Sequence, residues 1–337
     1  MFKWKGIFGG IFMISRTKVA LSEETIQSIF KNAGIEGVRR ISPLGEGEYN
    51  AVYGVTADKD YVLKIAPAPE TPVLTYEKNM MEAEIYWYDI IRKNTGIRVP
   101  QVYYKDFSGK QIPSDYFIME KLQGRQRNEI TADKSVIAEK TAKMVAQIHK
   151  IHNDRFGYIQ NELYANWYEA LCSMIQNLNE DARKAGKRSK KGERLLNYAH
   201  RYKSILVDVP CCMVNYDLWD ANVLCTRDKN GEIAFSWIDP ERSFWGDRIF
   251  DFICLENPFA PLREKKDSLK AYNAAAEIKV TPDRETEIRY AFAQGLMGLI
   301  QEVEKYYRYT PRHFGWWRNV LSGNLMYKRS FGVLKNG

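Results

Sequence analysis

The sequence predicts an α+β protein with two lobes: an N-terminal lobe with an antiparallel sheet and a helix, and a larger, mostly helical C-terminal lobe. Three observations support this prediction. The chain has 337 residues, which is enough for about two lobes of roughly 150 residues each. Strand-like segments dominate before Lys121, and helical periodicity dominates after it. Hydrophobic residues make up 45% of the chain and charged residues 27%, so both lobes can bury a core.

The predicted N-terminal lobe, residues 13–120, begins with a helix. Ser22 is expected to cap this helix, two acids follow in its first turn, and Gly34 is expected to end it. Three short apolar segments separated by turn residues then predict an antiparallel meander. The predicted strands are 38–41, 51–55, 61–65, 99–104 and 116–120, with a helix at 76–93.

The predicted C-terminal lobe, residues 121–337, contains segments whose apolar residues recur at helical spacing. These segments are 132–152, 164–180, 191–206 and 283–308. A basic linker from Arg183 to Lys191 is expected between the second and third helices. Recruitment of an anionic substrate is one interpretation of this linker, and a solvated surface segment is the one we prefer.

Residues 1–12 are predicted to form a flexible tail. Their apolar stretch is too short to cross a membrane and lacks a convincing signal-peptide cleavage site. An interfacial membrane anchor is the alternative. A start codon at Met13 would remove the tail altogether.

Charge and cysteine content narrow the class of protein. The formal net charge of +8 suits an anionic ligand such as a nucleotide. No run of Lys and Arg is interleaved with aromatic residues in the manner of a nucleic-acid groove. We therefore expect neither a nucleic-acid nor a membrane partner, and a monomer or weak homodimer. The cysteines lack Cys-x-x-Cys spacing and predict reduced, mostly buried thiols in a cytoplasmic protein: Cys172, Cys211, Cys212, Cys225 and Cys254.

Two features of the N-terminal lobe suit a nucleotide. Gly45 and Gly47 lie in a turn between predicted strands, where backbone N–H groups can approach phosphates because no side chain intervenes. An ordinary hairpin turn is the alternative. Lys64 lies inside an apolar strand, and a buried cation needs an acidic partner. Glu84 is the predicted partner because apolar residues share its helix face, and Glu82 is the alternative.

The strongest chemical signal is Asp217, followed five residues later by Asn222 in a short polar loop between apolar segments. A second acid, Asp239, ends another predicted strand. Oxygen atoms from the two loops can together hold Mg²⁺, which prefers oxygen ligands. Asp217 can orient or deprotonate an attacking hydroxyl. Because phosphoryl transfer needs held phosphates, a placed metal and an oriented nucleophile, the sequence predicts a kinase.

The order of these acidic residues resembles a known family. Asp217 and Asn222, then Asp239, then Asp247 and Asp251 are similar in spacing to the aminoglycoside phosphotransferase and choline kinase family, which has a protein-kinase-like fold. The resemblance covers roughly residues 38 to 255.

The resemblance implies a role for each candidate. Lys64 would contact the α and β phosphates of ATP, or of GTP, and Glu84 would pair with it. The hinge backbone near Glu120 and Leu122 would hold the purine. The resemblance further implies that Asp217 is the catalytic base and that Mg²⁺ is bound by Asn222 and Asp239.

The chain departs from the family pattern at the start of the catalytic loop. The family usually has His-Gly-Asp there, whereas this sequence has Asn215-Tyr216-Asp217. The acid is kept, and Asn215 is expected to replace the structural hydrogen bonds of the histidine.

Spacing distinguishes a small-molecule kinase from a protein kinase. The segment between Asp239 and Asp251, residues 240–250, leaves no room for an activation segment. The sequence therefore predicts a phosphotransferase that transfers the γ-phosphate to a hydroxyl of a small acceptor, aminoglycoside-like or an amino alcohol. A nucleotide-binding pseudoenzyme that acts through protein association is the alternative. Neither the acceptor nor the choice between ATP and GTP follows from the sequence.

Other polar residues near these motifs receive structural interpretations. His149 and His152 lie three apart on a predicted helix, but a third metal ligand is not close in sequence, so a structural role is expected. Asp247 and Asp251 are expected to brace the catalytic loop, and a helix N-cap is the alternative for Asp247.

Some residues of the second lobe could contact an acceptor. Trp219 and Trp245 lie in loops beside the catalytic acids and could line an acceptor pocket. Glu302 and Glu304 lie on a late predicted helix, where the family often binds cationic acceptors. Exposed helix acids are the alternative interpretation for both.

Overall fold

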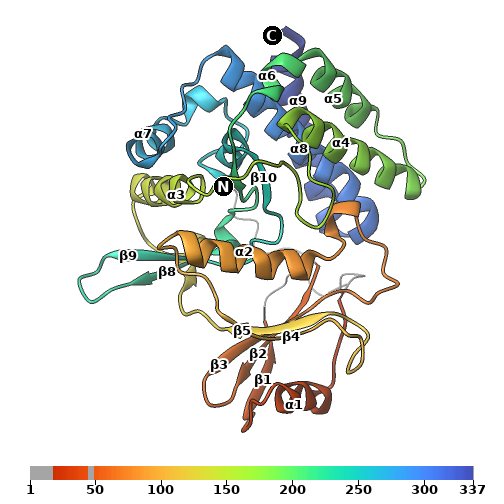
Figure 1. Cartoon of the computed structure of the whole chain (residues 1–337), viewed down its shortest axis with the longest axis vertical. Helices are drawn as coiled ribbons and strands as arrows, with labels where there is room; N and C mark the ends of the chain where they lie inside the picture. Colours follow the sequence, from red (N-terminus) through yellow and green to blue (C-terminus); the bar gives the residue numbers. More distant parts are fainter. Residues whose placement is uncertain (1–17, 45–48, 337) are drawn as a thin grey trace.

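The computed structural model describes residues 18–44 and 49–336. Its N-terminal lobe contains helix α1 (Glu23–Asn32), helix α2 (Met80–Asn94) and one antiparallel sheet with strand order β1-β2-β3-β5-β4 (Figure 1). The strands are β1 (Arg40–Pro43), β2 (Ala51–Thr56), β3 (Asp60–Ile65), β4 (Val102–Asp106) and β5 (Tyr116–Glu120). The predicted meander is present, because β1, β2 and β3 pair in sequence order.

Both faces of this sheet are covered by helices, and this explains why β3 is apolar almost throughout. Tyr61, Leu63 and Ile65 belong to a core that includes the buried face of α1. The intervening residues Val62 and Lys64 point to the opposite face, since side chains alternate along a strand. Val62 packs there in a core shared with α2, which lies between the sheet and the C-terminal lobe in Figure 1. Lys64 therefore emerges on the side of the sheet that faces the second lobe.

The start of α1 was predicted correctly from the sequence, whereas the start of α2 was not. In α1 the predicted cap is present, since the Ser22 side chain accepts from the Thr25 N–H. The predicted start of the second helix was wrong. A short 3-10 turn, η1 (Thr75–Glu77), comes first, and Asn79 has a left-handed φ of 56° that separates this turn from α2.

The C-terminal lobe is mostly helical, as predicted, and it also contains two small antiparallel sheets, β7 with β10 and β6 with β8 and β9. Its helices are α3 (Lys134–Ile148), α4 (Trp167–Lys184), α5 (Lys190–Arg201), α6 (Lys203–Val207), α7 (Lys266–Ala275), α8 (Arg284–Arg308) and α9 (Phe314–Asn336). Its strands are β6 (Arg125–Gln126), β7 (Cys211–Val214), β8 (Val223–Arg227), β9 (Ile233–Trp237) and β10 (Phe244–Asp247). Short 3-10 turns are η2 (Arg127–Glu129), η3 (Asp220–Asn222), η4 (Arg248–Cys254) and η5 (Leu262–Glu264).

Helices α8 and α9 pack closely as an antiparallel pair, and α9 was not predicted. Glycines recur along α9, and glycine disfavours a helix in an isolated sequence. The structure explains one of them, Gly323, which faces a glycine of α8. A Cβ on Gly298 of α8 would lie 3.1 Å from the Gly323 carbonyl oxygen of α9. The glycines therefore permit the close approach of the two helices, and this packing offsets their poor helix propensity.

Three further predictions were corrected or supported by the fold. The segment predicted as one helix at 191–206 forms α5 and α6, because Tyr202 interrupts the helical backbone. The basic linker is shorter than predicted, since α4 continues to Lys184 and α5 begins at Lys190. All five cysteines are buried free thiols.

Within residues 18–44 and 49–336, no helix has the length and apolar character to cross a membrane.

Candidate active site

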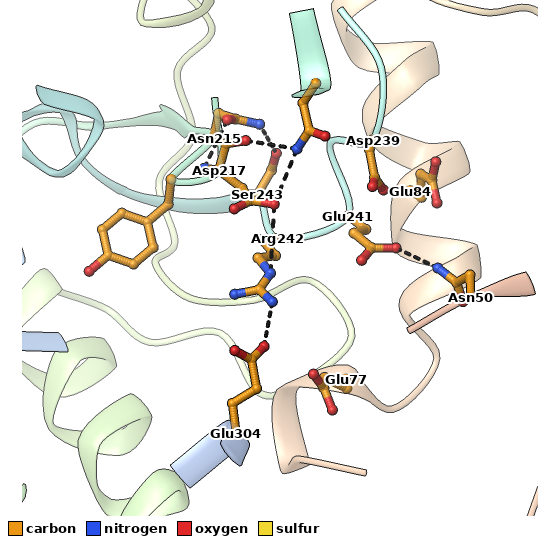
Figure 2. Close-up of polar contacts among 12 residues, drawn as sticks. Asn50, Glu77, Glu84, Asn215, Asp217, Asp239, Glu241, Arg242, Ser243 and Glu304 are labelled. Atoms are coloured by element: carbon orange, nitrogen blue, oxygen red, sulfur yellow. Dashed lines mark hydrogen bonds and ion pairs between the residues drawn. The ribbon is translucent and has the colours of Figure 1, made fainter. Parts of the chain in front are cut away.

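Lys64 lies at the centre of three carboxylates. Its Nζ is 2.6 Å from Glu84 Oε2, 2.6 Å from Asp239 Oδ1 and 2.9 Å from Glu241 Oε2. Glu82, the alternative partner, is exposed. The three acids come from α2 and from the loop after β9, and Figure 2 shows their carboxylates converging. One oxygen of each lies within 4.8 Å of the others. Glu241 was not predicted from the sequence, although it lies two residues after Asp239.

Burial and the shared Lys64 cation shift the pKa values of these three acids in different directions. Burial raises the pKa of Glu84 to about 7, and Lys64 opposes this shift. Burial and the neighbouring Asp239 raise the pKa of Glu241 to about 8. Burial also acts on Asp239, but the Lys64 ammonium outweighs it and holds the pKa of Asp239 below its usual value. Near neutral pH, Asp239 therefore carries the most firmly held negative charge of the three.

The loop after β7 presents Asp217 and Asn222 together. The Asp217 N–H donates to Asn215 Oδ1 at 2.9 Å, and Asn222 Nδ2 donates to the Asp217 carbonyl oxygen at 2.9 Å. Asn222 Nδ2 also lies 3.3 Å from Asp217 Oδ2. Because the amide nitrogen of Asn222 serves the loop, its oxygen is the atom that it can offer to a metal. Burial raises the pKa of Asp217 to about 6, although the nearby Arg242 guanidinium lowers it.

The two proposed metal ligands are brought together by a hairpin. Strands β8 and β9 pair in antiparallel register with Val223 opposite Trp237. Asn222 and Asp239 lie just outside this pair, and the Ile238 N–H donates to the Asn222 carbonyl oxygen at 3.0 Å. Asp239 has a left-handed φ of 62°, and its N–H donates to Tyr88 Oη at 2.9 Å. This backbone conformation is uncommon outside glycine and is often found at functional sites.

Asp251 and His149 brace the catalytic loop from behind. Asp251 accepts from the backbone N–H of Asn215 at 3.0 Å and of Tyr216 at 2.6 Å. His149 Nε2 lies 2.9 Å from Asp251 Oδ2, and its Nδ1 lies 2.9 Å from Tyr272 Oη. Burial lowers the pKa of His149 despite the neighbouring Asp251. Both residues thus have the structural role that the sequence predicted.

Asp247 has a structural role as well. It caps the turn η4 through Ile249 N at 3.2 Å, and Arg289 Nη1 contacts both of its carboxylate oxygens. This agrees with the N-cap alternative.

Tyr216 occupies the position where the family usually has glycine, and the structure shows what this substitution requires. Its φ is 61°, in the left-handed region that glycine adopts most easily. Its ring is fully buried and packs against Phe244 and Phe250, with centroid distances of 5.6 and 5.7 Å. Its hydroxyl donates to the Ala293 carbonyl oxygen in α8. Aromatic packing thus offsets a strained backbone directly before Asp217.

We expect Tyr216→Gly to destabilise the protein even though it relieves this strain. Loss of a buried aromatic ring costs about 3–5 kcal/mol, whereas relief of a left-handed residue returns about 1–2 kcal/mol. The free energy of unfolding, measured by urea denaturation, should fall by the difference. Tyr216→Phe is the matched control and should cost about 1 kcal/mol through the lost hydrogen bond. A glycine variant as stable as the parent would contradict this account.

A chain of buried ion pairs leads away from Asp217. Arg242 Nε lies 3.7 Å from Asp217 Oδ2, and Arg242 Nη2 lies 2.6 Å from Glu304 Oε1 (Figure 2). Arg308 Nη1 lies 2.8 Å from the same Glu304 oxygen, and Arg308 also pairs with Glu77. Burial opposes ionisation of Glu304, but the two guanidinium groups lower its pKa to about 2. Glu304 is therefore an ionised partner of two arginines and not an exposed helix acid.

A cavity of about 1170 Å³ borders the outer end of this chain. Glu77 and Tyr49 form part of its wall, together with the proline-rich segment 66–73 and the ends of α4 and α8. The Arg308 guanidinium lies 5.1 Å from the centroid of the Tyr49 ring. Asp217 and Lys64 do not line this cavity, so the ion-pair chain stands between it and Asp217.

The remaining candidates lie in different surroundings. Gly45 and Gly47 fall outside the described residues. Glu120, at the end of β5, forms an ion pair with Arg98, and its N–H donates to the Gln101 carbonyl oxygen at 2.8 Å. Leu122 follows in the half-buried segment that joins β5 to β6.

The two tryptophans predicted to lie in loops near Asp217 and Asp239 have different surroundings, since Trp245 is in strand β10 whereas Trp219 is in the loop after β7. Trp245 is a core residue, 4% exposed and 5.0 Å from the Trp87 ring, so its expected place in an acceptor pocket was wrong. Trp219 is partly buried against the core, directly beside the catalytic loop.

The fold and the site define a class of protein before any comparison is made. A sheet lobe that carries a lysine–glutamate pair, opposed to a helical lobe that carries an acidic loop and a second acid after a hairpin, is a protein-kinase-like architecture. The model of the APH phosphotransferase enzyme family matches residues 40–287, which is more than half of the chain. The chain belongs to this family.

Solved structures share the fold. A protein from Ralstonia eutropha JMP134, provisionally assigned as an aminoglycoside phosphotransferase, has 12% identity and a TM-score of 0.65 over 94% of this chain and 98% of that chain. A protein from Thermobifida fusca YX-ER1, provisionally assigned as a fructosamine-3-kinase, has 19% identity and a TM-score of 0.64 over 92% and 100%. A streptomycin–ATP complex of APH(2″)-IIa has 15% identity and a TM-score of 0.58 over 93% and 98%. A search of the curated proteins finds no match.

Proposed function

We propose that this protein is a small-molecule kinase that transfers the γ-phosphate of ATP, or of GTP, to a hydroxyl group of a small acceptor. One observation carries the proposal: Asp217 is presented beside Asn222, and the hairpin register sets Asn222 next to Asp239, which contacts Lys64. These are the residue types that phosphoryl transfer needs for its base, its metal and its phosphates. Membership of the phosphotransferase family supports the same reaction.

Asp217 is the proposed catalytic base. It would accept the proton of the acceptor hydroxyl as the oxygen attacks the γ-phosphorus and the bond to the β-phosphate oxygen breaks. Its backbone is held in place by its N–H, which donates to Asn215, and by its carbonyl oxygen, which accepts from Asn222. Its raised pKa makes it a better proton acceptor than an exposed aspartate, and it is still ionised at neutral pH.

The donor set near Asp239 suits Mg²⁺. Carboxylate and amide oxygens are the ligands that this hard cation prefers, and Asp239, Glu241 and Asn222 supply them from one hairpin and its loop. Asn222 and Asp239 would hold the ion, with Glu241 as an additional carboxylate. When bound, Mg²⁺ would neutralise charge on the phosphates.

Lys64 and the segment after β5 are the proposed nucleotide contacts. If Asp239 binds the metal ion, Lys64 still has Glu84 and Glu241 as partners. Its ammonium group therefore stays positioned for the α and β phosphates. The backbone of Glu120 to Leu122 would bind the purine, and the turn with Gly45 and Gly47 would cover the phosphates. We place the junction of the two lobes after residue 120, at the end of β5.

The acceptor hydroxyl must reach Asp217 beside the Arg242–Glu304 ion pair. An aminoglycoside-like compound or an amino alcohol would meet charges of both signs there, and this suits a polar acceptor. We infer a cytoplasmic location, because the five buried thiols are free.

We expect the pH dependence of kcat/KM to report Asp217. This ratio follows the ionisation of the free enzyme, and a base with a pKa of about 6 loses its function when it is protonated. The ratio should therefore be nearly constant above pH 7 and fall about tenfold per pH unit well below pH 6. The affinity for nucleotide, measured by calorimetry over the same range, is the control. A flat profile from pH 5 to 8 would be inconsistent with Asp217 as the base.

The function itself is tested by a phosphate-transfer screen with purified protein, radiolabelled ATP or GTP, Mg²⁺ and a panel of hydroxyl compounds. The panel should contain aminoglycosides, amino alcohols and sugars. Transfer to at least one acceptor, dependent on Mg²⁺ and absent in Asp217→Asn, is the expected result. Tight nucleotide binding with neither phosphate transfer nor slow nucleotide hydrolysis would instead support the pseudoenzyme.

A further inference from the structure

Helix α9 carries an apolar stripe on its outer surface. Within residues 18–44 and 49–336, seven large hydrophobic side chains are exposed, and four of these lie on α9. They are Phe314, Trp317, Leu321 and Leu325, with exposures of 74%, 54%, 65% and 48%. Their spacing of three and four residues places them on one face of the helix. Their clustering requires an explanation, because exposed apolar residues are normally scattered singly.

The same surface is strongly cationic. Helix α9 contains no acidic residue, and its exposed residues include Arg318, Lys328 and Arg329. At 100° per residue, Lys328 continues the line of the stripe toward the C-terminus, while Arg318 and Arg329 border one side of it. Long cationic side chains at such positions can extend toward charged groups while their stems cover apolar surface.

A second cationic segment lies alongside α9. Lys191 of α5 hydrogen-bonds Asn324 and lies 4.9 Å from the Tyr327 ring centroid. Arg194 lies 4.8 Å from the Phe331 ring centroid. These contacts place the α5 part of the basic segment 183–194 beside the stripe. The segment has seven cations and a single acid, Glu193: Arg183, Lys184, Lys187, Arg188, Lys190, Lys191 and Arg194.

Figure 1 shows α5 and the C-terminal end of the chain at the end of the C-terminal lobe that lies opposite the β1–β5 sheet. The stripe begins near the cavity, since the Trp316 ring lies 5.7 Å from that of Tyr306 in the cavity wall, and it runs from there toward the C-terminus.

We propose that the α9 stripe and its basic border form a docking surface for an anionic lipid membrane. A helix with Trp, Phe and Leu on one face and cations beside them lies in the plane of a membrane interface, with its apolar side chains inserted at the headgroup boundary. Cations near an anionic bilayer add to this binding. The proposal is independent of the kinase reaction. It revises the expectation from sequence that no membrane partner exists.

Charge distinguishes this partner from a second copy of the chain. Two copies that packed stripe against stripe would bring together the basic borders of both, and like charges oppose such an interface. An anionic bilayer meets the same cations with opposite charge. The apolar side chains then enter the lipid without a matching protein groove.

The test is flotation of the full-length protein with vesicles of phosphatidylglycerol and phosphatidylcholine, compared with vesicles of phosphatidylcholine alone. We expect binding to the anionic vesicles, weakened by salt because the charges are exposed. Leu321→Gln/Leu325→Gln should weaken it about tenfold or more, since two apolar contacts are lost. Lys328→Gln/Arg329→Gln should also weaken it. The N-terminal residues are the same in every variant, so their contribution cancels.

Matched controls separate α9 from general surface effects. Val136→Gln/Ile278→Gln removes two exposed apolar side chains elsewhere, and Lys229→Gln/Lys279→Gln removes two exposed cations elsewhere. Both should bind anionic vesicles like the parent, and thermal melts should show all variants folded. Absence of binding to anionic vesicles, or equal binding by Leu321→Gln/Leu325→Gln, would overturn the proposal. So would a lipid-free dimer in sedimentation velocity that Leu321→Gln/Leu325→Gln dissociates.

Discussion

Replacing Asp217 with asparagine is expected to lower kcat for phosphate transfer by about three orders of magnitude, within the range that general base catalysis supplies. Asparagine has nearly the same shape but cannot accept the proton of the acceptor hydroxyl. Nucleotide affinity should change little, because Lys64, Asp239 and the segment after β5 are retained. The measurement is a comparison of kcat by transfer assay and of nucleotide Kd by calorimetry.

The fold should survive this substitution. The Asp217 backbone hydrogen bonds to Asn215 and Asn222 remain, and Arg242 keeps Glu304 as its closer partner at 2.6 Å. Asp154→Asn is the matched control, since Asp154 is an exposed acid away from the loop. It should have the activity of the parent. An Asp217→Asn enzyme with undiminished kcat would refute the proposed base.

Replacing Lys64 with methionine is expected to cost about 3–5 kcal/mol of unfolding free energy, because it leaves buried acids without their cation. Lys64 contacts Glu84, Asp239 and Glu241 at 2.6–2.9 Å and is itself only 4% exposed. Methionine keeps most of the side-chain volume, so the loss reports charge more than packing. Nucleotide affinity should fall as well. Urea denaturation and calorimetry measure the two effects.

Two controls show that the loss arises from uncompensated acids. In Lys64→Met/Glu241→Gln one of the acids is neutral, so this double variant should be less destabilised than the sum of the two single variants. The defect of Lys64→Met should also shrink as the pH falls through the raised pKa values of Glu84 and Glu241, about 7 and 8, because the protonated acids need no cation. A defect below about 1 kcal/mol that does not change with pH would contradict the role of Lys64 as their shared cation.

Local signals predicted the N-terminal lobe well. The cap at Ser22 and the pairing of β1, β2 and β3 in sequence order depend on residues close in sequence, and the structure contains them. The start of α2 was less accessible, because the strained residue Asn79 interrupts a pattern that otherwise reads as one helix. Helix α9 was missed because its glycines disfavour a helix in isolation, and the role of Gly323 is evident only from its packing against Gly298 of α8.

The residues of the candidate site also divide into those that local sequence patterns identify and those that only the fold brings together. Asp217, Asn222 and Asp239 were identified from spacing and from the short strands around them, since the hairpin that joins them is local. Glu241 was missed, although an acid two residues after Asp239 could have been identified as a second partner for Lys64. Arg242 and Glu304 are separated by 62 residues in the chain, and no local pattern pairs them.

The sequence alone therefore determined the order of strands and helices around the loop after β7 and the residue types of the proposed base, the proposed metal ligands and the lysine. These features depend on residues a few positions apart, and the regular backbone geometry of strands and turns fixes where the side chains of such residues lie. Only the tertiary structure decided that Asp239 and Glu241 join Glu84 around Lys64, which arginine stands beside Asp217, and that an apolar stripe on α9 meets a basic segment of α5. Those outcomes depend on how buried faces from distant parts of the chain pack together, and burial sets both the pKa values of the acids and the surface that is left exposed.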